Sequence, residues 1–146
     1  MSAVPRMEHV GVVVGDLAAV IEFFLALGLV LQGQWSGEGR SLDRIVGLEG
    51  ARTDAAMMQT PDGRGSLELV KFHSPSHSGG DSAAPANAPG LRHLAFAVED
   101  IDAVLARLRA CGGELVGELV RYEDTFRLCY VRGPEGIIVE LAERIG

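Results

Sequence analysis

Apolar residues alternate with small or polar residues along Leu91–Val98, which is the period-two pattern of a β-strand. Leu94, Phe96 and Val98 share one face of this strand. His93 shares the other face with two alanines. Because this histidine is flanked on its own face only by alanines, the pattern predicts a buried strand whose second face lines a hollow.

The same design occurs near the start of the chain, in Glu8–Val14. There one face carries three valines, and the other carries His9 with a glycine and a valine. His9 and His93 are 84 positions apart (93 − 9). At this offset an aspartate, an apolar helix stripe and a glycine also recur, as the pairs Asp16/Asp100, Leu17/Ile101, Val20/Val104 and Gly28/Gly112. A repeat that keeps these features in order indicates one structural module written twice.

Each copy is predicted to fold as β-α-β-β-β. In the first copy the periodicity predicts strands at Met7–Val14, Leu29–Trp35, Thr53–Thr60 and Ser66–Phe72, a helix at Leu17–Leu27, and a short extra helix within Ser41–Leu48. In the second copy it predicts strands at Leu91–Val98, Leu115–Val120, Phe126–Val131 and Ile137–Ala142, and a helix at Ile101–Ala110.

A stretch rich in Ser, Gly, Ala and Pro separates the two copies, and this composition is typical of a mobile linker. The sequence therefore predicts an α+β fold in a single domain, 1–146. Module one spans about 7–72, the linker about 73–90 and module two about 91–143. His73 and His77 fall in this linker, and we expect them to be solvated loop residues.

Charge and composition narrow the classes of function. The 146-residue chain has a formal net charge of −7, which argues against a nucleic-acid surface because such a surface needs a basic stripe. The apolar run 10–31 contains Asp16 and Glu22. Because an acidic residue in a membrane span costs roughly 2.5 to 3.5 kcal/mol, we expect no membrane segment. No secretory signal is recognisable, and two cysteines that match no disulfide framework favour a reducing, cytoplasmic location.

Two glutamates occupy equivalent places in the copies. Glu68 follows a Pro-Asp-Gly turn and Glu140 a Pro-Glu-Gly turn, and both lie among apolar neighbours in the last strand of their module. A carboxylate in such a strand is expensive to bury unless it is paired or bound to a cation. Together with His9 and His93, the two glutamates form a ligand set for one divalent metal ion. Mixed nitrogen and oxygen ligation suits Zn, Ni, Co, Fe or Mn.

The sequence resembles the vicinal oxygen chelate superfamily in its H-V-G-V-V-V-G-D-L and R-H-L-A-F-A-V-E-D-I stretches and in its L-E-L-V and G-P-E-G-I-I-V-E-L-A strand ends. This superfamily includes glyoxalase I, methylmalonyl-CoA epimerase, extradiol dioxygenases and the fosfomycin and bleomycin resistance proteins. The resemblance spans 7–143. It implies paired modules that form a cupped mixed sheet around the metal site, a small-molecule substrate and a homodimer.

Glyoxalase I is the member that the ligand pattern resembles most. Its metal is held by His, Glu, His and Glu, which match His9, Glu68, His93 and Glu140. The implied activity is that of a lyase or isomerase that abstracts a proton next to a carbonyl and stabilises the resulting enediolate on the metal. Glu140 is the preferred base and Glu68 the second choice.

An anionic group of the substrate could meet Arg127 or Arg121, whereas Arg132 is interpreted as an ordinary surface charge. Two other functions stay open. Extradiol dioxygenases use two histidines and one carboxylate, so an oxygen-dependent, iron-containing enzyme is one alternative. The other is a non-catalytic drug-binding protein like the bleomycin resistance proteins, although the presence of all four ligand-type residues counts against it.

Overall fold

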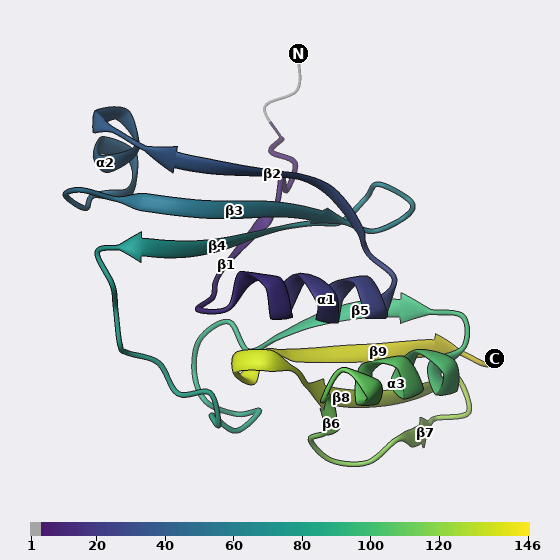
Figure 1. The fold of residues 1–146 in the computed structure, drawn as a ribbon. Coiled ribbons are helices and arrows are strands. Elements are labelled where there is room, and N and C mark those ends of the chain that lie inside the picture. The colour runs from purple at the N-terminus through teal and green to yellow at the C-terminus, as the bar shows by residue number, and fades with distance from the viewer. Residues whose placement is uncertain (1–3) are drawn as a thin grey trace. The chain divides into compact units, whose positions relative to one another are not determined.

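Two sheets of similar topology make up the chain in the computed structural model, which describes residues 4–146 (Figure 1). The residues up to His77 form one compact unit, called unit one below, and Ser78–Gly146 form unit two. Each unit contains a sheet with a helix on one of its faces.

Unit one has the strand order β1-β4-β3-β2. Strand β1 runs parallel to β4, whereas β3 is antiparallel to both of its neighbours. A short helix, α2, follows β2, where the sequence predicted an extra helix. The elements of unit one are β1 (Val10–Val13), α1 (Leu17–Leu27), β2 (Val30–Glu38), α2 (Arg40–Val46), β3 (Arg52–Gln59) and β4 (Ser66–Ser74).

Unit two repeats this plan. Its strand order is β5-β9-β8-β6, with β7 also paired to β8, and β5 again runs parallel to the last strand, β9. The elements of unit two are β5 (His93–Val98), α3 (Ile101–Ala110), β6 (Glu114–Leu115), β7 (Val120–Tyr122), β8 (Phe126–Arg132), the turn η1 (Pro134–Gly136) and β9 (Ile138–Arg144). The predicted α+β fold with two β-α-β-β-β modules is therefore confirmed.

One predicted strand is divided in the structure. The sequence pattern predicted a continuous strand at Leu115–Val120, but β6 ends at Leu115 and β7 begins only at Val120. The interruption contains Gly117, and glycine weakens a strand because it loses the most backbone freedom on folding and has no side chain to pack.

The two main helices have the bounds that the sequence predicted, because their ends carry local signals. Asp16 accepts a hydrogen bond from the backbone N–H of Ala19, and Asp100 accepts one from Ala103, both at 3.1 Å, so both are N-caps. Helix α1 packs on β2, β3 and β4, and α3 packs on β8 and β9. The buried helix residues are Val20, Ile21, Phe23, Phe24 and Leu27 in α1 and Ile101, Val104, Leu105 and Leu108 in α3.

The segment between the modules is not mobile along its whole length. The guanidinium of Arg132 donates hydrogen bonds to the backbone carbonyls of Ser82 (3.2 Å), Ala84 (2.8 Å) and Gly136 (3.3 Å), and Ala84 is buried. Arg132 therefore fixes residues 82–84 to the turn before β9. This corrects both the predicted mobility of these residues and the interpretation of Arg132 as an ordinary surface charge.

Within residues 4–146, no helix combines the length and the apolar character needed to cross a membrane. Both cysteines are free thiols, Cys111 exposed and Cys129 buried. Burial raises the pKa of the Cys129 thiol, as expected when the charged thiolate loses contact with water.

Candidate metal centre

The face of the unit two sheet that α3 does not cover carries a histidine and a glutamate in contact range. The register of β5 and β9 places Ala95 beside Glu140, and His93 lies two residues earlier on the same face of β5. The distance between His93 Nε2 and Glu140 Oε1 is 3.2 Å. Both side chains are partly exposed, 34% for His93 and 22% for Glu140, so a bound ligand can reach them.

Unit one contains the same pair at the same register. The pairing of β1 with β4 places Gly11 beside Glu68, and His9 lies two residues before Gly11. His9 Nε2 is 3.9 Å from Glu68 Oε1. On its other side, His9 Nδ1 is 3.8 Å from a carboxylate oxygen of Glu8.

The donor chemistry of the two pairs fits a divalent metal ion. Neither Glu68 nor Glu140 has a hydrogen-bond or ion-pair partner among residues 4–146 other than the matching histidine. Neutral imidazole nitrogen and carboxylate oxygen together suit Zn, Ni, Co, Fe or Mn. Each pair supplies only two donors, and no cluster of three or more such side chains occurs within the described residues. Each pair alone is thus an incomplete ligand set.

Tyr130 is a residue of this face that the sequence analysis did not assign to the site. It lies directly opposite Glu140 in the β8–β9 ladder, and its ring centroid is 4.8 Å from that of His93. Alternation along β8 could have indicated this position, because Tyr130 is out of phase with the buried Cys129 and Val131. In unit one the residue that pairs with Glu68 is Met57.

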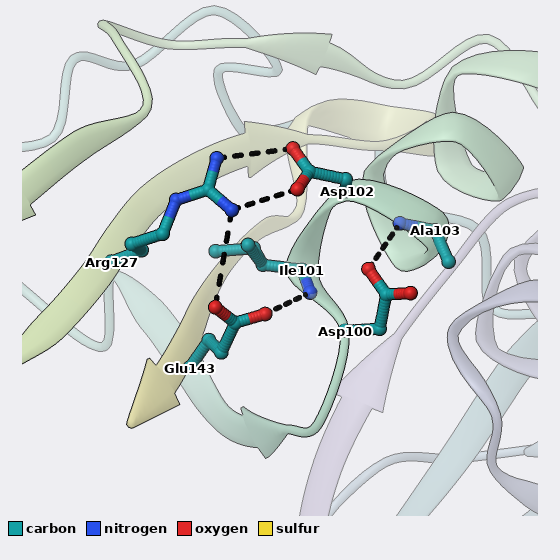
Figure 2. A network of polar contacts seen from close by, with 6 residues as sticks. All are labelled: Asp100, Ile101, Asp102, Ala103, Arg127 and Glu143. Atoms are coloured by element: carbon teal, nitrogen blue, oxygen red, sulfur yellow. Dashed lines mark hydrogen bonds and ion pairs between the residues drawn. The ribbon is translucent and has the colours of Figure 1, made fainter. Parts of the chain in front are cut away.

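Arg127 lies on the opposite face of the unit two sheet. It pairs with Glu143 in the β8–β9 ladder, three positions before Tyr130, and an odd separation along a strand places two side chains on opposite faces. Its guanidinium donates two hydrogen bonds to Asp102, at 2.7 and 3.1 Å, and lies 3.9 Å from Glu143 (Figure 2). Glu143 in turn accepts a hydrogen bond from the backbone N–H of Ile101 at 2.9 Å. These contacts tie β8 and β9 to the start of α3, which favours a structural role for Arg127 in place of the expected substrate contact.

The same pairing affects the ionisation of both partners. Hydrogen bonds from Arg127 hold the pKa of Asp102 below its usual value, and Asp102 raises the pKa of Arg127 further. Arg121 pairs with Arg127 in the β7–β8 ladder, so it also faces away from Glu140. Its side chain forms an exposed ion pair with Asp124 at 2.9 Å. The placement of neither arginine supports a contact with a substrate at the His93–Glu140 pair.

His73 is not a solvated loop residue, as the sequence analysis expected, because β4 extends to Ser74. Its Nε2 lies 2.7 Å from Asp54 Oδ2, and the hydroxyl of Ser36 donates to Asp54 Oδ1 at 2.5 Å. The hydrogen bond from Ser36, followed by that from His73, lowers the pKa of Asp54. Asp54 belongs to the face of the unit one sheet opposite to that of Glu68, because it alternates with Met57 along β3.

Two helix-backed sheets that each present a His–Glu pair at the same register define a duplicated-module protein of the vicinal oxygen chelate type. A family model described as "Glyoxalase/Bleomycin resistance protein/Dioxygenase superfamily" matches residues 6–141. The chain belongs to this superfamily. The predicted resemblance is thereby confirmed.

Individual relatives agree with this assignment. The crystal structure of a glyoxalase family protein from Bacillus cereus is 44% identical, covers 99% of this chain and 97% of its own, and has a TM-score of 0.95. The "Uncharacterized protein YaeR" of Escherichia coli (strain K12) is 28% identical, and the match covers 99% of this chain and 100% of the relative. The fosfomycin resistance protein FosX from Listeria monocytogenes is 16% identical, covering 96% of this chain and 91% of its own with a TM-score of 0.62, so it shares the fold.

Proposed function

We propose that His9, Glu68, His93 and Glu140 together hold one divalent metal ion, and that the protein is a metal-dependent lyase or isomerase of the glyoxalase type. One observation carries this proposal. In each unit the histidine lies two residues before the residue that pairs with the glutamate, on the face that the helix leaves open. Two incomplete donor pairs with the same construction would complete one four-ligand site, with two nitrogen and two oxygen donors.

The proposed reaction is the transfer of a proton next to a carbonyl group. When bound, the metal ion supplies a Lewis acid for the carbonyl oxygen. Glu140 takes the proton from the carbon atom, the electrons of the broken C–H bond move toward the carbonyl oxygen, and a carboxylate then returns a proton to the neighbouring carbon. Glu68 is the second candidate for the base.

The surroundings of Glu140 favour it over Glu68 as the base. Tyr130 stands opposite Glu140 and packs against the ring of His93, so two side chains that can contact a substrate lie beside this carboxylate. Around Glu68 the corresponding position holds the thioether Met57, which offers only a weak acceptor. A substrate hydroxyl or carbonyl therefore finds a second polar partner beside Glu140.

The superfamily also guides the proposals on partners. Its members bind small molecules and commonly form dimers. We infer a small-molecule substrate and a homodimer for this chain, with function in the cytoplasm.

Metal content is the decisive measurement. Wild-type protein, purified without added chelator, should carry about one divalent ion per chain by elemental mass spectrometry. Glu140→Gln should lower metal affinity by more than the roughly 10–100-fold that follows removal of an outer-shell partner. Glu22→Gln, on the exposed side of α1, is the matched control and should retain full occupancy. Full occupancy in Glu140→Gln, or no metal in wild type, would contradict the proposal.

Activity then separates the reactions. Wild-type protein should act either on methylglyoxal with glutathione or on an acyl-CoA in an epimerisation assay. Inactivity in both assays would count against the lyase or isomerase. Bound iron with oxygen consumption on a catechol would identify a dioxygenase instead, and tight drug binding without metal would identify a non-catalytic binding protein.

A further inference from the structure

A hollow of about 390 Å³ opens in unit one beside the His9–Glu68 pair. It lies between the segment that leads into β1 and the β3–β4 hairpin, and its walls include Arg6, Glu8, Gln59, Gly63, Arg64 and Ser66. None of the four proposed metal ligands lines this hollow, but the lining residue Glu8 has a carboxylate oxygen 3.8 Å from His9 Nδ1.

The strand register places the hollow on the same face of the unit one sheet as His9 and Glu68. Ser66 pairs with Gln59, and Glu68 pairs with Met57 two residues further along, so all four side chains point to one face. Because Val10 pairs with Leu67 in parallel register, one step back brings His9 level with Ser66. The hollow therefore begins in the row of the sheet that contains His9.

Two arginines line the hollow of a chain that is acidic overall. The guanidinium groups of Arg6 and Arg64 make no hydrogen bond or ion pair with other described residues, whereas Glu8 supplies one negative charge. The nearby carboxylate of Asp62 accepts hydrogen bonds from the Thr60 hydroxyl (2.6 Å) and the backbone N–H of Arg64 (3.0 Å). These hydrogen bonds, and to a smaller extent the charge of Arg64, lower the pKa of Asp62. Two available guanidinium groups beside a hydroxyl and an amide are the donors that proteins use to bind carboxylate or phosphate.

In unit two the position equivalent to this hollow is covered by part of the chain itself. In its sheet the row of His93 contains Ile138 and Arg132, and Arg132 binds the carbonyls of Ser82 and Ala84. The chain itself thus covers the end of this row. In unit one, Gln59 stands where Arg132 stands in unit two. Among the described residues it bonds only the side chains of Gln32 and Ser66 and the backbone carbonyl of Gly63 in its own hairpin.

We propose that the hollow of unit one binds the anionic group, carboxylate or phosphate, of a substrate whose oxygen atoms approach the proposed metal site. Arg6 and Arg64 hold this group by charge-assisted hydrogen bonds, and Ser66 and Gln59 line its path toward His9. The substrate class is then a small carbonyl compound with an anionic tail. This inference rests on the proposed function for the substrate, but the anion site itself can be tested without metal.

The first test uses metal-free protein of full length and two probes, inorganic phosphate and succinate. Each is titrated at constant ionic strength while backbone amide and arginine Nε–H signals are followed by NMR. Binding should shift the signals of Gly63, Arg64 and Ser66 with saturation, and the probe that binds more tightly identifies phosphate or carboxylate as the preferred group. Arg6→Gln combined with Arg64→Gln should weaken binding at least tenfold.

Arg44→Gln, on the exposed helix α2, is the matched control and should leave the affinity unchanged. Because the Arg6 and Arg64 side chains bond no other described residue, the double variant should fold like wild type, and its NMR spectrum shows this directly. Arg64→Lys provides a second variant and should retain part of the affinity. Shifts that do not saturate, or that persist in the double variant, would overturn the anion site.

The second test uses protein loaded with Ni²⁺ and compares acetohydroxamate with succinic acid monohydroxamate, which chelate alike but differ in an anionic tail. Calorimetry should show at least about fivefold tighter binding of the tailed compound to wild type, and no such advantage in the double variant. An equal affinity in wild type would overturn the inferred substrate class. Failure of both compounds to bind would count against the proposed metal function. The anion site would then be judged by the titration of metal-free protein with phosphate and succinate alone.

Discussion

The two units share a strand order and a His–Glu pair, but they differ at the end of the sheet beside that pair. In unit two, Arg132 fixes Ser82 and Ala84 over the row of His93. In unit one the matching row of His9 opens into a hollow with two arginines. Both units thus keep the His–Glu pair and the sheet that carries it. The end of the sheet beside this pair, called the rim below, is covered by residues 82–84 in unit two and is open to a ligand in unit one. We infer that the rims, more than the ligand set, determine which substrate fits.

The neighbours of the two glutamates differ as well. Tyr130 stands opposite Glu140, whereas Met57 stands opposite Glu68. A phenol can donate or accept a hydrogen bond and a thioether is a weak acceptor, so only the glutamate of unit two has a strong hydrogen-bonding side chain directly opposite it. The duplicated fold provides two equivalent scaffolds, and single side chains make their surroundings unequal.

The closed rim of unit two should make one glycine far less replaceable than its counterpart. Gly63 and Gly136 both have positive φ, 75° and 81°, so alanine costs about 1–2 kcal/mol at either position. A Cβ at Gly63 would meet open space, whereas at Gly136 it would collide with the backbone of Ser82. Overpacking adds roughly 1–3 kcal/mol, so Gly136→Ala should destabilise the protein more than Gly63→Ala in urea unfolding.

Equal losses of unfolding free energy in these two variants would mean that residues 82–84 move aside at no cost. In that case residues 82–84 would cover the rim of unit two without being held there, and the two rims would not differ in their fixed structure.

The second prediction concerns the arginine that holds this rim. Arg132→Gln removes charge-assisted hydrogen bonds to Ser82 and Ala84 and should cost about 1–2 kcal/mol. Hydrogen exchange at the amides of Ala83 and Ala84 should become faster, because these residues lose their connection to the sheet. Gln59→Ala, the matching change in unit one, removes only neutral hydrogen bonds and should cost about 0.5–1 kcal/mol. Unchanged exchange at Ala83 and Ala84 would show that other contacts hold this segment.

Local sequence signals predicted most elements of both units, except for the division of one strand into β6 and β7 and the extension of β4 to Ser74. The bounds of α1 and α3 follow from the capping residues Asp16 and Asp100 and from apolar stripes within each helix. The strands are indicated by alternating apolar and polar residues. The equivalence of Glu68 and Glu140 is indicated by the Pro-Asp-Gly and Pro-Glu-Gly turns that precede them. These features depend on residues close together in the chain, which is why a single sequence contains them. The convergence of the four proposed ligands remains a prediction from the repeat.

Contacts between distant residues were not predictable in this way. Arg132 binds Ser82, 50 positions away, and His73 binds Asp54, 19 positions away, so no periodicity connects the partners. Alternation along β8 places Arg127 on the same face as Cys129, but the sequence does not reveal which face α3 covers. That choice depends on the packing of the helix against the sheet, and it determines that Arg127 meets Asp102 rather than the Glu140 side.

The smallest expected effect concerns the pH dependence of stability that arises from Asp54 and Asp102, two acids that lie away from the proposed metal ligands. Asp54 and Asp102 both have a lowered pKa, so the unfolded chain binds more protons than the native protein in the window just below the ordinary value of 3.8. Their contribution to stability is therefore present above that pH and is lost as the pH falls through the native pKa. Asp54→Asn and Asp102→Asn should each flatten the acid limb of unfolding free energy against pH.

The causes of the two shifts differ, and this difference can be measured by carboxyl NMR titration. At Asp54 the largest cause is the hydrogen bond from the neutral Ser36 hydroxyl, followed by the one from His73. Ser36→Ala and His73→Gln should therefore each raise the pKa of Asp54. At Asp102 the hydrogen bonds come from the charged Arg127, so added salt should raise the pKa of Asp102 more than that of Asp54, because ions screen exposed charge pairs. An equal response to salt would show that the ion pair with His73 dominates in unit one, and that the two acids are held in the same way.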